Sequence, residues 1–383
     1  MRARPGRSIV DDMQHLSQIA LEFPLSHGAF ASGIATLETL RGGPPSTDLS
    51  FVLSGARSAV SFALPFDRTA IDPYLMKRDR LGLERSYNHA EITATGLGVH
   101  FANYLTKRGF PSVYVAAGQV YREDIQSRAS EAEQKLAEEF REKEYVHKEG
   151  STMVPDIALR YLAIASGVGS MGISGNVLTR QEGAAIALGG IVTTAELVPT
   201  APIPEEENYC DDCRLCMASC ISGLMDPDGE ISIRMGGVEH KHAGKRSIAR
   251  CQMACGGITG LHPSGKWSTW SPGRFIIPKT DEELSQLGHA MGAFFERPNM
   301  EGGVHHHVLI GKKYYMSCSH CQLVCVPDKE ERKRRYKLLK RGGCIVQNPK
   351  DGSVKPLPPD EAREYVASMS PEIRAMYENV EEG

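Results

Sequence analysis

The chain carries a dense group of cysteines near its middle. Four of them fall in the segment CDDCRLCMASC with the spacing C-x2-C-x2-C-x3-C: Cys210, Cys213, Cys216 and Cys220. This spacing is typical of the bacterial-ferredoxin run, in which three thiolates hold one [4Fe–4S] cluster and the fourth ligates a second cluster. The sequence therefore predicts an iron–sulfur site that moves electrons singly at low potential.

A second, sparser group of cysteines follows further along the chain. The segment CSHCQLVC contributes three, and a fourth lies between the two runs: Cys318, Cys321, Cys325 and Cys251. Eight thiolates of this kind suffice for two [4Fe–4S] clusters. Two further cysteines, Cys255 and Cys344, are interpreted as buried small hydrophobes. The pair in CQMAC leaves open whether Cys251 or Cys255 is the ligand.

Structural zinc and disulfides are the alternative interpretations of these cysteines. Zinc sites favour two separated C-x2-C pairs or mixtures of Cys and His, whereas a tight triple with a fourth cysteine at x3 is a different pattern. Both runs lack the proline that usually follows the last cysteine, because Ile221 follows Cys220 and Val326 separates Cys325 from Pro327. Iron–sulfur ligation remains the preferred interpretation.

Composition indicates a globular protein of the reducing interior of the cell. With 383 residues the chain has room for two domains, and its 41% hydrophobic and 24% charged residues are typical of a folded core. A net charge of −3 indicates neither DNA nor a membrane surface as a partner. No apolar run is long enough to span a membrane, and no export signal opens the sequence, so we expect a cytoplasmic location.

The N-terminal half alternates between expected strands and helices. The apolar stretch 49–66 predicts a buried strand, and 111–118 predicts a shorter one. Residues 88–108 predict a helix whose apolar face is formed by Ile92, Leu97, Phe101 and Leu105. Residues 123–148 predict a charged surface helix.

Outside the cysteine runs, a glycine-rich loop is the segment of the sequence most indicative of function. A helix is expected before it, with Pro155 and Asp156 in its first turn and Gly167 at its end. A strand, 185–197, follows the loop. The G-x-G-x-x-G of residues 167–172 differs from a nicotinamide fingerprint, because that motif follows a strand and opens a helix.

These motifs together resemble a known family. SGARSAVSFALP, SGVGSMGISGN, ALGGIVTTAELVP, the first cysteine run, SIARC and the second run occur here in an order similar to that of the cobalamin-dependent iron–sulfur reductases. That family includes reductive dehalogenases and epoxyqueuosine reductase. The resemblance covers roughly residues 50–327.

The resemblance implies an α/β fold in which a nitroreductase-like corrinoid-binding core precedes a ferredoxin-like module with two [4Fe–4S] clusters. The expected divisions are a lead segment, the core, the two-cluster module with an aromatic insert at 256–317, and a C-terminal tail: 1–47, 48–202, 203–345 and 346–383. It implies one cluster on Cys210, Cys213, Cys216 and Cys325. It implies the other on Cys220, Cys251, Cys318 and Cys321.

The resemblance also implies cobalamin held base-off, without a protein ligand to cobalt. The residues carried over for it lie in the glycine loop: Gly167, Gly169, Ser170, Met171, Gly172, Ser174 and Asn176. Without the resemblance, this loop is interpreted as an ordinary turn between a helix and a strand. The aromatic insert suits an apolar pocket over the corrin or plain core packing, through Trp267, Trp270, Phe294 and Phe295.

The function implied is reduction of a small organic substrate, with reductive dehalogenation the preferred branch. The alternatives are an epoxyqueuosine reductase-like enzyme acting on tRNA and a non-catalytic iron–sulfur carrier or corrinoid activator. Candidate proton donors or their neighbours are Asp156, Tyr121, Tyr161 and Arg160, although the preferred interpretation of Asp156 is a residue that stabilises the helix start. The basic run 328–341 is either a solvated helix or a dock for a ferredoxin or flavodoxin-type electron donor.

Overall fold

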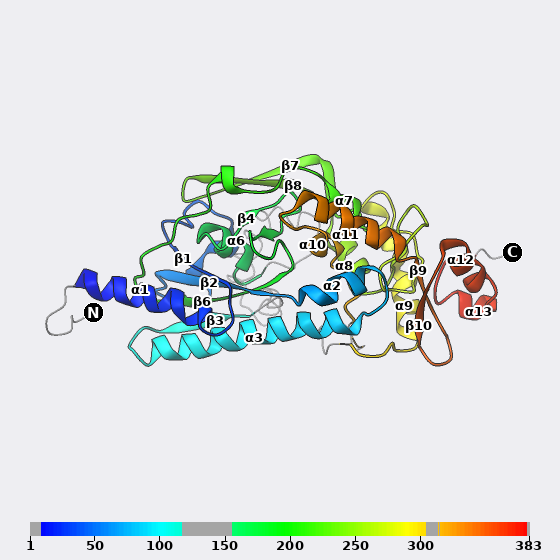
Figure 1. The fold of residues 1–383 in the computed structure, drawn as a ribbon, viewed down its shortest axis with the longest axis horizontal. Coiled ribbons are helices and arrows are strands. Elements are labelled where there is room, and N and C mark those ends of the chain that lie inside the picture. The colour runs from blue at the N-terminus through cyan, green and yellow to red at the C-terminus, as the bar shows by residue number, and fades with distance from the viewer. Residues whose placement is uncertain (1–8, 117–154, 304–312, 314, 381–383) are drawn as a thin grey trace, which may run out of the picture. The chain divides into compact units, whose positions relative to one another are not determined.

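The structure is a computed structural model, and it describes residues 9–116, 155–303, 313 and 315–380. The chain forms two compact units, each assembled from separated segments. The first unit contains the segments up to Phe66, His89–Cys213 and Gly229–Ala243. The second contains Asp67–Asn88, Arg214–Asp228 and the segment from Gly244 onward. Figure 1 shows the elements of both units in chain order by colour.

The first unit is built around a four-stranded antiparallel sheet with strand order β1-β2-β6-β3. Its strands are Ala31–Thr36, Ser58–Pro65, Ile186–Thr193 and Ser112–Val115 for β1, β2, β6 and β3. In the register, Val60 of β2 lies opposite Ile34 of β1 and Ile191 of β6. Seven of the eight residues of β2 are buried, because helices cover both faces of the sheet.

Alternate residues of the sheet enter two separate cores. Val60 packs with residues of α1 (Ile9–Leu25) and α3 (Leu81–Thr106), while its neighbour Ala59 packs with α6 (Leu159–Ala165). Successive strand residues point to opposite faces, so this alternation places α6 on one face and α1 with α3 on the other. The strand predicted within 49–66 begins only at Ser58; residues Leu49–Phe51 form a 3-10 turn, η2.

The buried stripe of α3 differs from the predicted one. Ile92 is 72% exposed, whereas Ala94, Phe101 and Leu105 are buried. The stripe runs through Ala94 and Gly98 to the two large side chains, so small residues occupy its first turns and Ile92 points away from it. The predicted charged helix at 123–148 lies outside the described residues.

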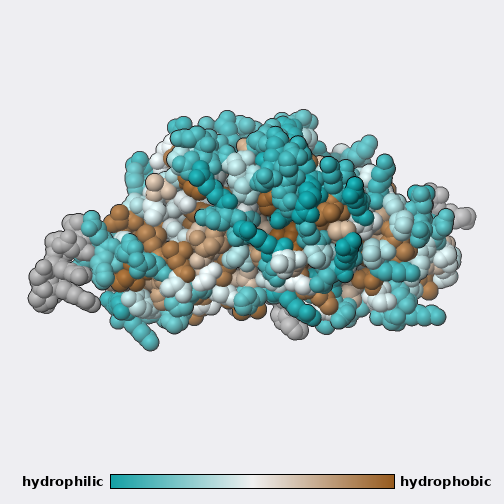
Figure 2. Space-filling model, in the orientation of Figure 1, coloured by the Kyte–Doolittle hydropathy of each residue, from teal (hydrophilic) through white to brown (hydrophobic). Residues whose placement is uncertain are grey.

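Two short hairpins complete this part of the chain. The first pairs β4, Ser170–Met171, with β5, Val177–Leu178. The second joins β7, Met225–Met235, to β8, Val238–Lys245, through the left-handed glycines 236 and 237. Alternate residues of β7 near this turn enter the core of the first unit, and Figure 2 shows a largely hydrophilic surface over the hairpin. Short 3-10 turns, η1 and η4, occupy Pro45–Thr47 and Glu205–Glu207.

The second unit is mainly helical. Its helices are α2 Arg68–Leu75, α7 Leu215–Ala218, α8 Ile248–Cys255, η5 Glu282–Leu287, α9 Gly288–Glu296, α10 His320–Leu323, α11 Lys329–Arg341, α12 Pro359–Ala367 and α13 Pro371–Arg374. Its one hairpin in the described residues pairs β9, Cys344–Gln347, with β10, Val354–Leu357. One core gathers around Phe275 and Phe294, and another around Val346 and Tyr377. Within the described residues, no helix combines the length and apolar character that a membrane crossing requires.

Candidate functional site

Short helices carry many of the cysteines. Cys216 lies in α7 and Cys321 in α10, and these two helices pack against each other. Cys251 and Cys255 both lie in α8. All ten cysteines of the chain are free thiols in the structure, so the disulfide interpretation finds no pair.

The backbone within both cysteine runs adopts an unusual conformation. Asp212, Arg214 and Ser319 have φ of 52°, 55° and 100°, and they are three of the four non-glycine residues with positive φ among those described. The fourth is Lys77. Non-glycine residues rarely enter this region, and successive right- and left-handed residues turn N–H groups into concave nests that are common at iron–sulfur sites. The positive φ of these residues therefore indicates that the backbone of both cysteine runs has a role other than packing.

Four cysteines of the second unit converge around Cys318. Desolvation raises the pKa of the Cys318 thiol well above its ordinary value, and the neighbouring Cys321, Cys251 and Cys220 raise the pKa further through like-charge repulsion. These four are the cysteines that the family resemblance assigns to one cluster. A bound cluster would relieve this repulsion, because its irons stabilise thiolates.

Their arrangement differs from that of a single-ion site. No group of three or more His, Cys, Asp or Glu side chains in the described part of the chain is placed to hold one metal ion. A cubane of four irons spreads its four thiolates around a larger body than one ion does. Four electrostatically coupled thiols therefore fit a [4Fe–4S] cluster as the group to be held.

The structure also distinguishes the remaining cysteines. Cys251 interacts with Cys318, while Cys255 lies one helical turn further along α8. The choice of Cys251 over Cys255 as the ligand stays a prediction. Cys344 is fully buried and belongs to the core around Val346 and Tyr377, as expected for a small hydrophobe.

Cys210 of the other predicted set is held beside the glycine loop. Its sulfur accepts a hydrogen bond from the Ile173 N–H at 3.4 Å. Asn208 accepts from the Cys210 N–H at 3.1 Å and donates to the Met171 carbonyl at 3.0 Å. Hydrogen bonds to cluster sulfurs tune reduction potential. The assignment of Cys210, Cys213, Cys216 and Cys325 to one cluster stays a prediction.

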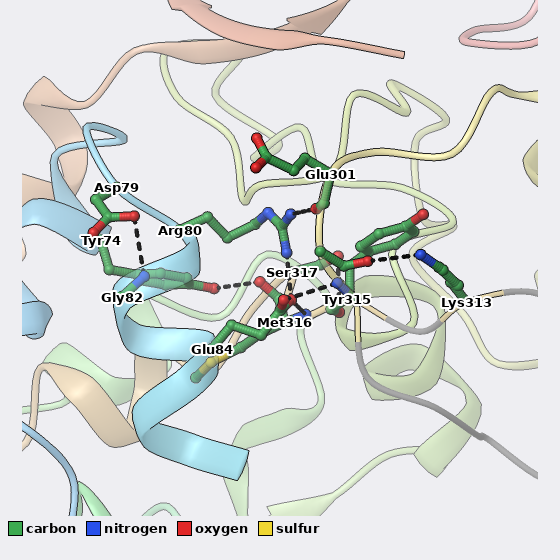
Figure 3. A network of polar contacts seen from close by, with 12 residues as sticks. Tyr74, Asp79, Arg80, Gly82, Glu84, Glu301, Lys313, Tyr315, Met316 and Ser317 are labelled. Carbon is green, nitrogen blue, oxygen red and sulfur yellow. Dashed lines mark hydrogen bonds and ion pairs between the residues drawn. The ribbon is translucent and has the colours of Figure 1, made fainter. Parts of the chain in front are cut away.

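A buried ion pair holds the chain that leads to Cys318, as Figure 3 shows. Arg80 pairs with Glu84, and their side chains are 4% and 5% exposed. Glu84 accepts from the N–H groups of Gly303 at 2.9 Å and Met316 at 3.0 Å, and Arg80 donates to the Glu301 carbonyl. The pair therefore fixes both sides of the segment between residues 303 and 316.

Tyr74 extends this network to the cysteine itself. Its hydroxyl lies 2.7 Å from the Cys318 carbonyl oxygen and 3.0 Å from the Met316 carbonyl oxygen. Its own carbonyl accepts from the indole N–H of Trp270 at 3.1 Å. Sequence reasoning missed Tyr74, Arg80 and Glu84, because nothing in their local sequence distinguishes them from surface residues.

The immediate surroundings of Cys318 are aromatic and basic. The ring of the fully buried His320 lies 5.7 Å from that of Trp267 and 6.2 Å from that of Tyr74, measured between centroids. Lys77 is only 1% exposed and interacts electrostatically with Cys318, while burial lowers the pKa of its ammonium to about 7. Three aromatic residues of the insert are thus buried in the second unit, namely Trp267, Trp270 and Phe294. The fourth, Phe295, is 47% exposed.

The glycine loop packs against its own unit. A Cβ at Gly167 would lie 2.2 Å from the Ala201 carbonyl oxygen, and one at Gly169 would lie 2.5 Å from Val177. Gly172 faces the side chain of Leu178 in the same way. These glycines are therefore required by internal packing, and their contact with a corrin stays a prediction.

The polar residues predicted for a corrin also engage the loop itself. The Ser174 hydroxyl accepts from the Asn176 N–H at 3.3 Å, and both residues are buried. Met171 is buried in the core, and Ser170 pairs with Leu178 in the β4–β5 hairpin. The described residues of the loop thus form a compact turn, and their assignment to cobalamin stays a prediction.

The candidate proton donors occupy different environments. Asp156 precedes α6 instead of lying in its first turn, because the Ala158 N–H bonds to the Ser46 carbonyl and delays the helix to Leu159. Tyr161 is buried in the core, and Arg160 donates to the Gly175 carbonyl at 3.4 Å. Tyr121 lies outside the described residues.

Comparison with known proteins finds similarity among solved structures alone. No protein-family model matches the chain, and no curated protein matches it. The similar structures include a catabolic reductive dehalogenase, NpRdhA, at 11% identity and a TM-score of 0.48, covering 89% of this chain and 36% of the other. A reductive dehalogenase described for B12-dependent dehalogenation has 11% identity and a TM-score of 0.44, covering 74% and 35%.

Epoxyqueuosine reductase from Bacillus subtilis is also similar, at 16% identity and a TM-score of 0.31, covering 65% of this chain and 59% of the other. This chain therefore spans between 35% and 59% of the length of these three structures. All three are oxidoreductases by name.

Proposed function

We propose that this protein is an iron–sulfur oxidoreductase that holds two [4Fe–4S] clusters. The observation that carries the proposal is the interaction of Cys318 with three other thiols of the second unit, the four coming from three separate stretches of sequence. The first cysteine run supplies the second proposed cluster by its ferredoxin-like spacing. When bound, such clusters supply one-electron transfer at low potential.

The residues around Cys318 have definable roles in this proposal. The Tyr74 hydroxyl and the Glu84 carboxylate hold the backbone at Cys318 and Met316, so the Cys318 side chain would be positioned before a cluster binds. Trp267 and His320 are buried neighbours of each other in the same unit. Lys77, when protonated, would offset negative charge near the thiolates of a bound cluster.

The finer part of the proposal is the reaction. From the sequence resemblance, we assign the protein to reductive cleavage of a small organic substrate, preferentially a carbon–halogen bond. Two electrons and one proton convert the carbon–halogen bond to a carbon–hydrogen bond and a halide ion. Cobalamin is the cofactor that the resemblance implies for this cleavage, and the electrons would come from a ferredoxin or flavodoxin-type donor.

Oxygen-free purification followed by metal analysis tests both parts. About eight irons per chain supports the cluster assignment, and one cobalt retained after incubation with cobalamin supports the corrin. Iron without cobalt would reduce the function to electron transfer, and zinc in place of iron would overturn the proposal. Halide release from an organohalide panel then tests the reaction, with the Cys318→Ser variant as the inactive control.

A further inference from the structure

The basic helix α11 is attached directly to the cysteine-bearing part of the second unit. It packs against α7, which carries Cys216. The buried guanidinium of Arg335 donates to the Leu323 carbonyl at 2.9 Å, and Leu323 lies between Cys321 and Cys325. Within the second unit, the helix is therefore held against α7 and against the segment between Cys321 and Cys325, and Figure 1 shows α11 beside α7.

The C-terminal end of α11 leads to Cys318. Gly342 follows the helix, and a Cβ there would lie 3.1 Å from the Cγ of Lys77. Lys77 in turn interacts with Cys318. The buried Lys77 side chain thus lies beside the end of the helix and interacts with Cys318.

The charges of α11 divide into two groups. In the first turns, carboxylates pair with three of the cations: Lys333 pairs with Glu330, Arg335 with Glu331, and Arg334 with Glu331 and Asp72. In the last turns, Lys337, Lys340 and Arg341 are exposed and follow the spacing i, i+3, i+4 that places side chains on one face.

This second group has no acidic partner in the described part of the chain. No ion pair joins Lys337 or Arg341 to a described carboxylate, and the ammonium of Lys340 lies 4.8 Å from the Tyr336 ring centroid. Figure 2 shows a largely hydrophilic surface over α11. The three residues are hereafter called the basic end of α11.

We infer that the basic end of α11 is the docking surface for an acidic one-electron carrier protein. The inference rests on the proposed function, because it requires a cluster at Cys318. Complementary charge steers a partner and fixes its orientation. The whole chain carries −3, so the local positive charge of this face, and not the net charge, would attract an acidic carrier. One electron passes from the reduced carrier to the oxidised cluster, and no bond or proton changes place.

The test reverses the three charges in one variant, Lys337→Glu, Lys340→Glu and Arg341→Glu. A matched control reverses three other exposed cations of the same unit, Lys279→Glu, Lys350→Glu and Lys355→Glu, and changes the net charge equally. The Lys355 ammonium also lies 5.3 Å from an aromatic ring, that of Tyr365, so both sets lose one cation–π contact.

Two readouts are compared on the cluster-loaded proteins. The first is the dissociation constant for an acidic ferredoxin by calorimetry, and the second is its reoxidation rate in stopped flow. At low salt we expect the basic-end variant to lose about tenfold or more in both, and the control to lose far less. At high salt the wild type should approach the variant, because screening removes the attraction.

Other outcomes overturn the docking inference. Equal losses in both variants would assign the effect to net charge, and unchanged binding would remove the surface altogether. Loss of binding to a tRNA stem-loop, with ferredoxin binding retained, would assign the surface to nucleic acid. If the reversal lowers iron content, the neutral variant Lys337→Gln, Lys340→Gln and Arg341→Gln replaces it, with an expected smaller loss of the same sign.

The docking inference and the proposed function fail in different ways. A protein that binds no iron fails the proposed function before any carrier is added. A protein that binds iron, is reduced by dithionite and ignores the basic end contradicts the docking inference alone.

Discussion

The Tyr74 hydroxyl lies 2.7 Å from the carbonyl oxygen of Cys318, although the two residues are separated by 244 positions in the sequence. Both the phenol and the surrounding backbone are withdrawn from solvent, and desolvation raises the pKa of Tyr74 well above its ordinary value. The neutral phenol is therefore the stable form, and it is available as a hydrogen-bond donor to the cysteine loop.

Replacing Tyr74 by Phe should destabilise the protein by about 1–3 kcal/mol, because the Cys318 and Met316 carbonyls lose a buried donor. Tyr104→Phe is the control, since its hydroxyl makes no hydrogen bond among the described residues and its ring packs beside Arg108. Denaturant unfolding measures the difference. Equal stability of the two variants would show that the Tyr74 bond contributes nothing.

Breaking the Arg80–Glu84 pair should have a larger effect. Glu84→Gln leaves a guanidinium 4% exposed without its counter-charge, and we expect a loss of about 3–5 kcal/mol. Asp360→Asn breaks the exposed pair with Arg363 and should cost at most about 1 kcal/mol. A Glu84→Gln effect as small as that of the control would mean that the buried pair does not anchor the cysteine segment.

The cysteine chemistry was accessible to sequence analysis because it depends on spacing along the chain. The cysteine spacings of the run from Cys210 to Cys220 and of the set ending at Cys325 can be recognised in the sequence alone. The thiols that interact with Cys318 agree with an iron–sulfur interpretation of those spacings. The central strands within 49–66 and 185–197 were also predictable, since continuous apolar residues indicate a strand buried on both faces.

The residues that hold the Cys318 segment in place could not be predicted from the sequence, because their burial depends on contacts with distant parts of the chain. Lys77, Arg80 and Glu84 belong to a run of charged residues that suggests an exposed turn, yet all three are buried. Arg80 and Glu84 form hydrogen bonds with the backbone of residues 301 and 316, far away in the sequence. The packing role of the glycine loop was also inaccessible to sequence analysis. Its glycines are conspicuous in sequence, but only the structure shows that Ala201 and Leu178 require them.

The two cysteines of α8 provide a direct test of the ligand set. Cys251→Ser should remove about half of the iron, because Cys251 interacts with Cys318 and a [4Fe–4S] cluster needs four ligands. Cys255→Ser, one turn along the same helix, is the matched control and should retain all of it. Iron and acid-labile sulfide per chain are the measurements. Loss of iron in the Cys255 variant alone would exchange the two assignments.

Gly167 and Gly96 should respond oppositely to alanine. Gly167 has φ of 73°, and its Cβ would lie 2.2 Å from the Ala201 carbonyl oxygen, so Gly167→Ala should lose at least about 1–2 kcal/mol. Gly96 lies within α3 with open space around it, and Gly96→Ala should gain up to about 1 kcal/mol. Thermal unfolding compares them. A Gly167→Ala variant as stable as wild type would show that the close approach to Ala201 does not require glycine.

The pH dependence of stability should reflect Glu331 at the start of α11. Hydrogen bonds from Arg334 and Arg335 hold the pKa of this carboxyl below its ordinary value. A lowered folded-state pKa contributes stability that is complete above the unfolded value, near about 4.3, and is lost as pH falls through the folded value. The group is partly exposed, so the contribution is at most about 1 kcal/mol.

The stability advantage of wild type over Glu331→Gln should therefore shrink between about pH 5 and about pH 3. It should also shrink at pH 7 in about 1 M salt, where screening is strong. A difference that stays constant across both series would contradict an ionic origin.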